Sequence, residues 1–560
     1  MINRHIKFLP SNYKKKSFLF FLLLIIATIL ETFSIGLVFP LLEMIFKEDL
    51  SKTVFIFDIN SFFLIENKNQ FIRSFSIFLI LLYFGKSIYL VYFTYWQQKF
   101  SQNVFKFLSC NIFERYLKNP LNFFYNKNSS ELIRNTMIEC NKYGQYISIF
   151  FQLTVEITVA IFILIFLIYI EPFKTLIILF FAVLISTIYY LFTRKVIYKY
   201  GASKLKYNGK QIKTLNESFS GIKDIKLKLA ESFFLKLYEK YTNKSIEATY
   251  KQNTIVVAPK FLFEFLFVFG ILVSLIFMIR TEVDLNNIIP IFSLYIITGY
   301  RLIPCVMRIM NFLQQMKGLK PTIEILEKEL IANNKKISVD QYIKDFQFIN
   351  EIKISNINFS YQKNKSQIRN FSSSIKKNTC VGIIGKSGSG KSTLIDLITG
   401  MISPDKGEIL VDSKNIFSNL KGWQKKIGYV SQNVFLLDNT IKNNVAFGVD
   451  EKNIDLDNVK KSLKNAELEN FISQLKDGLE TVVGEKGVKI SGGQKQRLAI
   501  ARELYRKPEI LIMDEATSGL DEVTENQIME FLENVKNKLT VIIVSHRKNT
   551  LKNCDQIINL

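Results

Sequence analysis

Long apolar runs in the first 310 residues constrain this chain more than any other feature of its sequence. A helix that crosses the hydrocarbon core of a bilayer needs about 20 mostly apolar residues. The sequence therefore predicts an α-helical transmembrane domain with six spans, of which the middle two form a tight hairpin. The six stretches that meet the length requirement are residues 17–46, 71–96, 147–170, 174–192, 259–279 and 287–306.

The last 210 residues show instead the mixed pattern of a soluble α/β domain. A chain of 560 residues is long enough for two domains that each have a core. We expect the transmembrane domain over residues 1–330, a linker over 331–350 and the soluble domain over 351–560. A signal peptide is the alternative for residues 1–35, because a basic start precedes an apolar stretch there. The apolar stretch continues too far for a signal peptide, and five more spans follow it.

Basic residues give the chain a formal net charge of +24. They gather at the N-terminus and in residues 97–146 and 193–258, between apolar runs. The positive-inside rule places these stretches and the soluble domain in the cytoplasm, which predicts a multi-pass protein of the inner (cytoplasmic) membrane. A coding bias toward Lys, Ile, Asn and Phe also contributes to the positive net charge. The charge therefore does not require a nucleic-acid partner. The five cysteines and two histidines show no metal-site spacing, so we interpret the cysteines as reduced.

The two basic stretches have helical spacing of apolar residues, as in residues 195–250. We therefore expect the membrane helices to continue well beyond the bilayer and turn back. Their turns, near residues 119–134 and 217–226, would contact the soluble domain.

A glycine-rich motif follows a short apolar strand at residues 379–384 and precedes a helical pattern. This is the strand–loop–helix setting of a P-loop (Walker A motif). Glycines let backbone N–H groups surround phosphate oxygens, and the helix N-terminus favours negative charge. Lys391 would contact the β- and γ-phosphates of ATP, and Ser392 would bind Mg²⁺. The predicted ATP-binding residues here are Gly385, Lys386, Ser387, Gly388, Ser389, Gly390, Lys391, Ser392 and Thr393.

A second apolar strand, residues 509–513, ends in Asp514 and Glu515. Asp514 is placed to hold Mg²⁺ through a water, and Glu515 to act as the general base for an attacking water. A buried strand that merely ends in two acids is the alternative interpretation.

A third motif, Ile490-Ser491-Gly492-Gly493-Gln494, resembles the signature sequence of ABC ATPases. With a transmembrane domain first and an ATPase second, the whole chain resembles an exporter-type ABC half-transporter. The resemblance implies that Ser491, Gly493 and Gln494 contact the ATP bound to a partner chain, so a homodimer is expected. ATP would close the dimer, and hydrolysis would open it.

The resemblance also assigns residues outside the P-loop. Tyr361 matches the aromatic residue that stacks on adenine, Gln432 the glutamine that senses Mg²⁺, and His546 the switch histidine at the γ-phosphate. Residues 518–521 resemble the D-loop, and residues 484–487 resemble a segment that touches the intracellular loops of exporters. The chain ends at residue 560, earlier than is usual in this family, so we expect a final strand and tail to be missing.

Residues of the membrane half indicate which substrate, or cargo, the protein would transport. Residues 31–40 and 300–304 look similar to bacterial lipid-linked oligosaccharide flippases. Arg301 and Arg308 are seven residues apart and share a helix face, and Lys86 lies within the second span. Charges at membrane depth are costly and usually face a cavity or a partner. These three residues would thus bind an anionic glycolipid head.

Alternatives to the flippase hypothesis stay open at this point. The two arginines would otherwise pair with Glu31 or Glu264, or extend to the cytoplasmic surface. The same architecture also suits a multidrug, lipid or peptide exporter. An ATPase used for signalling or gating without transport is a third function, against which the intact Glu515 and His546 argue.

Overall fold

Helices form all of the regular structure that is described before residue 345. The computed structural model describes residues 11–37, 68–170, 172–280, 285–332, 345–362, 365–386, 388–516, 521–535, 538–546 and 551–560. Contacts divide the chain into a first unit, Met1–Asn119 with Phe124–Ile337, and a second unit, Pro120–Phe123 with Ser338–Leu560. The helices described before residue 333 are α2 (Ser11–Gly36), α5 (Lys68–Leu117), α6 (Leu121–Tyr125), α7 (Ser129–Ile133), the π-helix η2 (Arg134–Glu139), α8 (Cys140–Ile170), α9 (Pro172–Ser220), α10 (Ile222–Leu227), α11 (Glu231–Arg280) and α12 (Leu285–Ala332).

Four described helical stretches are long and apolar enough to cross a membrane. They contain the predicted second to fifth spans in whole or in large part. The predicted first and sixth spans lie partly outside the residues, or the side chains, that the structure describes, so the number of six remains a prediction. The four stretches are Ile72–Leu117, Ser129–Ile165, Leu179–Ser220 and Glu231–Val273.

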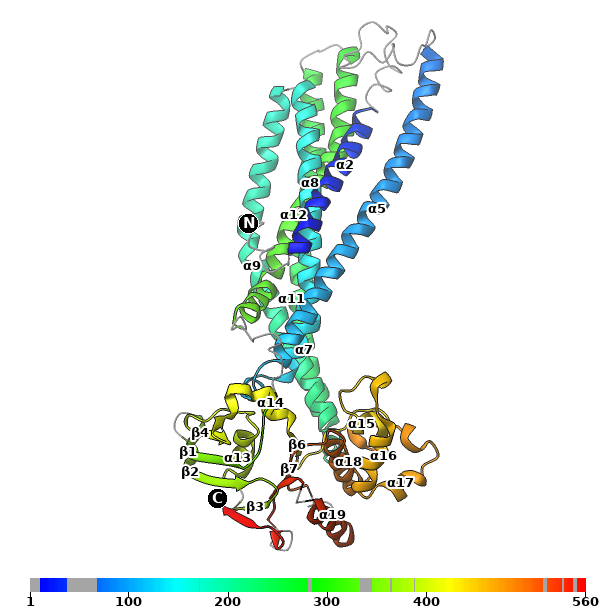
Figure 1. The fold of residues 1–560 in the computed structure, drawn as a ribbon. Helices are drawn as coiled ribbons and strands as arrows, with labels where there is room; N and C mark the ends of the chain where they lie inside the picture. The colour runs from blue at the N-terminus through cyan, green and yellow to red at the C-terminus, as the bar shows by residue number, and fades with distance from the viewer. Residues whose placement is uncertain are drawn as a thin grey trace. The chain divides into compact units, whose positions relative to one another are not determined.

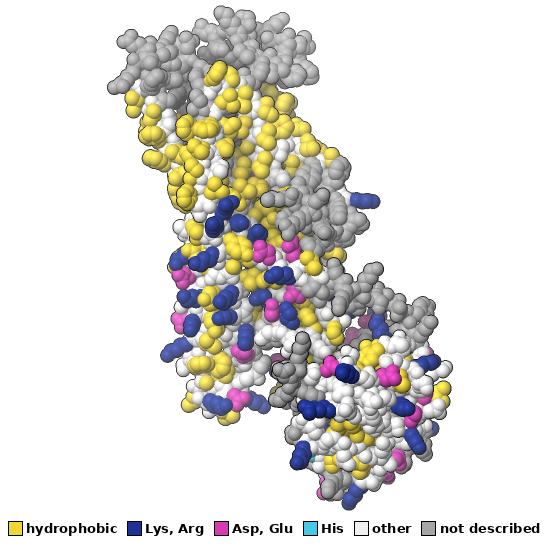
Figure 2. Space-filling view, turned by 90° about the vertical axis from the view of Figure 1, so that its left-hand side faces the viewer, with side chains coloured by type: hydrophobic (Ala, Val, Ile, Leu, Met, Phe, Trp, Pro, Cys, Tyr) yellow, Lys and Arg dark blue, Asp and Glu magenta, His cyan; other side chains and the backbone are white. Residues whose placement is uncertain are grey.

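The helices continue far beyond the length that a bilayer requires, which confirms the prediction from the basic stretches. α5 and α11 each have 50 residues, or about 75 Å of helix against a hydrocarbon core of about 30 Å. The short helices α6 and α7 lie between α5 and α8, and α10 lies between α9 and α11. Figure 2 shows hydrophobic side chains over one end of this unit and many Lys and Arg side chains along the rest of it.

Polar contacts around Glu139 join helices of the helical part. Glu139 is fully buried in the π-helix. One of its oxygens pairs with Lys142 Nζ at 2.9 Å, and the other accepts a hydrogen bond from Thr322 Oγ1 at 2.6 Å. A buried carboxylate is tolerated when both of its oxygens are satisfied in this way, so these contacts join the start of α8 to α12.

The second unit has the predicted α/β architecture (Figure 1). An antiparallel sheet has the order β2-β1-β4-β5, and a parallel sheet has the order β6-β7-β8-β3-β9. β7 and β8 are fully buried along their length, which explains their unbroken apolar sequence. The strands are β1 (Glu351–Gln362), β2 (Lys365–Lys376), β3 (Cys380–Ile384), β4 (Lys406–Val411), β5 (Lys414–Asn415), β6 (Ile427–Val430), β7 (Ile510–Asp514), β8 (Thr540–Val544) and β9 (Gln556–Asn559).

Helices of the second unit belong to two groups. α13 (Lys391–Ile398) packs against β2, whereas α18 (Gly492–Tyr505) packs against α15, α16 and β6. β9 pairs with β3 at the edge of the parallel sheet, so this sheet closes with a strand that the sequence had not identified. The remaining helices are α14 (Leu420–Lys425), α15 (Ile441–Val445), α16 (Leu456–Asn465), α17 (Glu469–Ser473) and α19 (Glu522–Val535).

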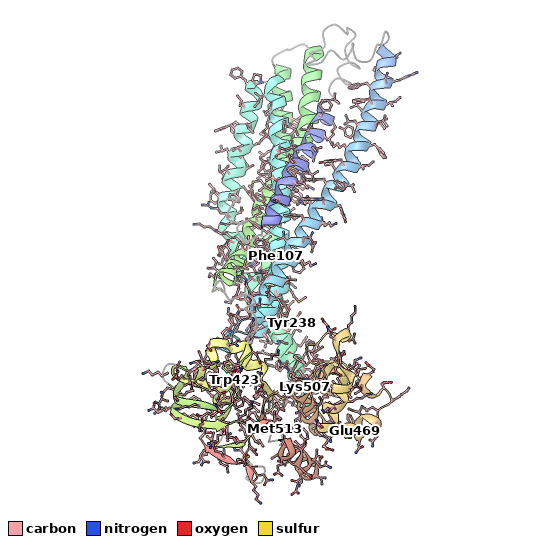
Figure 3. The ribbon with its side chains drawn as sticks, in the orientation of Figure 1. Phe107, Tyr238, Trp423, Glu469, Lys507 and Met513 are labelled. Atoms are coloured by element: carbon pink, nitrogen blue, oxygen red, sulfur yellow. The ribbon has the colours of Figure 1, made fainter. Side chains whose placement is uncertain are left out.

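Trp423 joins the start of the second unit to the helix that follows the P-loop (Figure 3). Its ring is fully buried, and its Nε1 donates a hydrogen bond to the carbonyl of Ile398, the last residue of α13, at 2.8 Å. Phe346 and Phe348 lie against the same ring, with centroids 5.7 and 6.3 Å away. The chain therefore enters this unit through an aromatic cluster that also holds α13 in place.

Candidate functional site

The P-loop connects β3 to α13 with a backbone that requires glycine. Gly390 caps α13 with a φ of +103°, and Gly388 has a φ of +81°, a region that other residues rarely adopt. A Cβ at Gly385 would lie 2.5 Å from Ser389 Oγ and 2.7 Å from the carbonyl oxygen of Leu560. The loop thus curls tightly at the N-terminus of a helix.

Two polar groups of the loop are arranged for an anion. Lys391 is 7% exposed, and its Nζ donates hydrogen bonds to the carbonyls of Gly385 at 3.0 Å and Lys386 at 3.1 Å. Ser389 Oγ is buried and has no hydrogen-bond partner among the described residues. An unsatisfied buried hydroxyl is costly, so Ser389 fits a loop that binds a further acceptor such as a phosphate oxygen. The Lys391 ammonium, held at the same loop, supplies the positive charge for that anion.

Asp514 ends β7, directly after Met513, which Figure 3 labels. It is 7% exposed, and its Oδ2 accepts a hydrogen bond from Tyr429 Oη at 3.3 Å. Burial raises the pKa of Asp514, while hydrogen bonds from Tyr429 and Ser392 oppose that rise. The structure therefore brings the Ser392 hydroxyl of the P-loop and the Asp514 carboxylate together.

Glu515 lies just beyond the strand, in a left-handed backbone conformation with a φ of +51°. Its Oε2 accepts a hydrogen bond from Gln432 Nε2 at 2.5 Å, and its Oε1 lies 3.0 Å from His546 Nε2. The predicted general base thus meets Gln432 and His546, the two residues that the resemblance assigned to Mg²⁺ and the γ-phosphate. The three residues come from the ends of β6, β7 and β8, which are neighbours in one parallel sheet.

Oxygen ligands suitable for Mg²⁺ lie at the same edge of the sheet. Mg²⁺ binds few protein ligands and keeps waters and substrate phosphates in its shell. Ser392, Gln432 and Asp514 supply a hydroxyl, an amide and a carboxylate. No group of three or more His, Cys, Asp or Glu side chains forms a metal site within the part of the chain that the structure describes. The donor set therefore fits a phosphate-bound Mg²⁺ better than a metal held by protein alone.

Tyr361 lies at the end of β1 with 47% of its surface exposed. Its ring packs edge-on against Phe359, with centroids 4.9 Å apart, and its hydroxyl lies 3.5 Å from Thr393 Oγ1. The tyrosine is therefore held beside the P-loop helix, with ring surface left for a planar base.

The signature motif caps α18. Ser491 and Gln494 form a capping box, in which Gln494 Oε1 accepts from the Ser491 N–H at 2.8 Å and Ser491 Oγ accepts from the Gln494 N–H at 3.3 Å. Ser491 is exposed, and Gly493 is half-buried. Figure 1 draws α18 beside α15 and α16, away from α13, so the signature and the P-loop of one chain lie apart.

Two of the three predicted cargo residues, Lys86 and Arg308, have partners inside the helical unit. Lys86 Nζ donates to Ser34 Oγ at 2.8 Å and lies over the Tyr83 ring, 4.9 Å from its centroid. Arg308 Nε pairs with Glu156 Oε1 at 2.6 Å. An internal partner for Arg308 was the alternative interpretation; the described partner is Glu156 rather than Glu264, and the side chain of Glu31 lies outside the description.

Some predicted site residues lie outside the description. The side chain of Arg301, residue Ser387 and residues 518–520 are not described. Sequence reasoning also missed two residues, Tyr429 and Glu156. Tyr429 lies three residues before Gln432, on the strand next to β7. Glu156 is an acid within a predicted span, a signal of the same kind as Lys86.

Comparison with known proteins identifies both units. The family model of the ABC transporter transmembrane region matches residues 17–300, and the ABC transporter model matches residues 368–518. The structure is similar to a bacterial Atm1-family ABC exporter with ATP bound, with a TM-score of 0.78 and 20% identity over 98% of this chain and 93% of that one. At that identity the likeness supports the fold alone.

Sequence relatives match a shorter stretch. The ATP-dependent lipid A-core flippase of Pasteurella multocida is 42% identical over 209 residues, 37% of this chain and 36% of the flippase. The leukotoxin translocation ATP-binding protein LktB of Mannheimia glucosida is 41% identical over 210 residues, 37% of this chain and 29% of that protein. The chain thus aligns with about a third of each relative. Because the two family models cover its helical and α/β units in order, the chain belongs to the ABC transporter family, as an exporter-type half-transporter.

Proposed function

We propose that this protein hydrolyses ATP to move a substrate across the cytoplasmic membrane, and that the substrate is a lipid-linked oligosaccharide. The convergence of Gln432 and His546 on the Glu515 carboxylate carries the ATPase part, because Glu515 follows β7 in the parallel sheet that also contains the P-loop strand β3. The family and the long apolar helices support transport.

The residues divide the chemistry of ATP hydrolysis among them. Lys391 and the loop N–H groups bind the β- and γ-phosphates, and Lys391 exchanges its loop carbonyls for phosphate oxygens. Mg²⁺, when bound, neutralises charge that develops on the transferred phosphoryl group, and Ser392, Asp514 and Gln432 would hold it. Glu515 accepts a proton from the attacking water.

A second copy of the chain would complete each site. In one chain, the exposed N-terminus of α18 lies away from the P-loop. A helix N-terminus with exposed N–H groups is suited to bind phosphate. Ser491 and the Gly493 N–H would therefore contact ATP bound by the Lys391 of the other copy in a homodimer.

Mixing two inactive variants tests this shared site. Lys391→Ala and Ser491→Ala homodimers should each hydrolyse ATP poorly, since every site lacks one component. A mixed dimer would have one doubly damaged site and one intact site, so mixing should restore part of the activity. If the subunits demonstrably exchange and activity does not return, each site is built within one chain.

The cargo assignment depends on the charged residues of the helical unit. Arg308 and Lys86 lie on long apolar helices, and arginine binds phosphate with strong, paired hydrogen bonds. A pyrophosphate-linked glycolipid combines such a head with an apolar tail. The lipid A-core flippase relative supports a lipid cargo. The leukotoxin relative favours the second candidate, a multidrug, lipid or peptide exporter.

Reconstitution in liposomes tests the cargo. Wild type should move a fluorescent lipid-linked oligosaccharide to the other leaflet in an ATP-dependent manner. Arg301→Ala combined with Arg308→Ala should lose flipping and keep basal ATPase activity. Lys260→Ala, which removes an exposed cation from α11, is the matched control and should flip normally. If the double variant flips as wild type does, or wild type moves a drug but no glycolipid, the flippase assignment is wrong.

A further inference from the structure

The ion pair between Arg308 on α12 and Glu156 on α8 is asymmetric. Arg308 Nε donates to Glu156 Oε1 at 2.6 Å, and Arg308 Nη2 has only a weak contact with Cys305 Sγ at 3.6 Å. Arginine and a carboxylate usually pair through two parallel hydrogen bonds. Here only one such bond forms, so among the described residues most of the donor capacity of the guanidinium is left for another acceptor.

The two side chains also differ in their surroundings. The side chain of Glu156 is 16% exposed, whereas that of Arg308 is 39% exposed. Glu156 Oε2 is buried and has no hydrogen-bond partner among the described residues. Val159, Ala160 and Ile163 of α8 form an apolar cluster beside this position. The carboxylate is therefore held inward with an unsatisfied oxygen, and the guanidinium is open on one side.

An unsatisfied carboxylate oxygen in apolar surroundings makes this pair weaker than a fully bonded one. A phosphate group offers several oxygens and can accept two hydrogen bonds from one guanidinium. A neutral lipid head offers no charge to replace that of Glu156. Exchange of Glu156 for a ligand at Arg308 thus requires an anion, whose additional hydrogen bonds have to offset the cost of leaving the carboxylate unpaired.

We propose that Glu156 determines cargo specificity by competing with the anionic head of the substrate for Arg308. This inference rests on the proposed function, because it assumes an anionic lipid cargo. Glu156 neutralises Arg308 when no cargo is bound and excludes uncharged lipids from it. A phosphate displaces Glu156, which breaks the contact between α8 and α12 that the pair provides.

The test measures ATPase stimulation in phosphatidylcholine liposomes as a function of added geranylgeranyl pyrophosphate, with geranylgeraniol as the uncharged probe. In Glu156→Gln the competitor loses its charge. The pyrophosphate concentration that gives half-maximal stimulation should therefore fall about tenfold, as expected when one charge-assisted hydrogen bond no longer competes. Structural damage would shift the response in the opposite direction. Glu264→Gln, a matched change on α11, should respond as wild type does.

A second variant covers the case in which Glu156→Gln does not fold. Glu156→Asp keeps the charge but shortens the reach to Arg308, so it should also respond at lower probe concentration, by a smaller factor. If wild type responds to the pyrophosphate and the folded variants do not shift to lower concentration, Glu156 is only structural and the inference is wrong, while the proposed cargo stands. If wild type does not respond to the pyrophosphate, the proposed cargo and this inference both fail.

Discussion

Replacement of Glu515 by glutamine isolates its proposed role as general base. Glutamine has nearly the same shape, so the side chain still reaches Gln432 and His546, which lie 2.5 and 3.0 Å from the carboxylate oxygens. It cannot accept a proton from water. Loss of a general base typically lowers the rate by about 10²–10⁴, which corresponds to about 2.7–5.4 kcal/mol at 1.36 kcal/mol per tenfold. ATP binding should be retained, because the phosphate contacts come from Lys391 and the loop.

The assay is phosphate release by protein in liposomes at saturating ATP, with nucleotide binding measured in parallel. Glu522→Gln is the matched control, since this exposed acid begins α19 only seven residues further along the chain. The assignment would be refuted if Glu515→Gln hydrolysed ATP within about threefold of the wild-type rate, because loss of a general base lowers the rate far more than that. Loss of ATP binding together with hydrolysis would instead indicate that Glu515 mainly shapes the loop.

Two further predictions concern the same unit. Trp423→Phe should lower the free energy of unfolding by about 1–3 kcal/mol, because the buried carbonyl of Ile398 loses its donor, and thermal unfolding of the purified protein measures this. Asp514→Asn should raise the Tm of nucleotide-free protein above neutral pH. Burial raises the pKa of Asp514 in the folded state, so the ionised carboxylate destabilises the folded protein. Wild type is therefore more stable at low pH, and it loses this stability as pH rises through the raised pKa of Asp514. The difference in Tm should therefore shrink as pH falls, and an unchanged difference would contradict this reasoning.

The phosphate-binding part of the site is predictable from sequence because it is local. The P-loop lies within nine consecutive residues, and the glycines, the lysine and the serine are each required by one short turn into a helix. The same holds for Asp514 and Glu515, which end one apolar strand. In these places a short sequence specifies both the backbone and the side chains that face the ligand.

The contacts of Glu515 with Gln432 and His546 could be predicted only with knowledge of the fold. Gln432 lies 83 residues before Glu515, and only the resemblance to ABC ATPases connected them in the sequence. The parallel order β6-β7-β8 explains why they meet, because strands that are neighbours in a parallel sheet have their carboxyl ends at one edge. Strand order is set by long-range pairing, which apolar patterns do not encode.

The membrane charges show a different limit of sequence reasoning. The cost of a charge at bilayer depth predicts that Arg308 has a partner, and helical spacing predicts which residues share its face. Neither argument says which helix lies opposite, so Glu31 and Glu264 were as acceptable from sequence as Glu156. The packing of α8 against α12 decides this, because it places Glu156 within 2.6 Å of Arg308 across 152 residues of sequence. The same packing leaves the second oxygen of Glu156 buried without a partner. An arginine that sequence alone would assign to cargo binding is thus held by an internal anion, which any anion that bound Arg308 would have to displace.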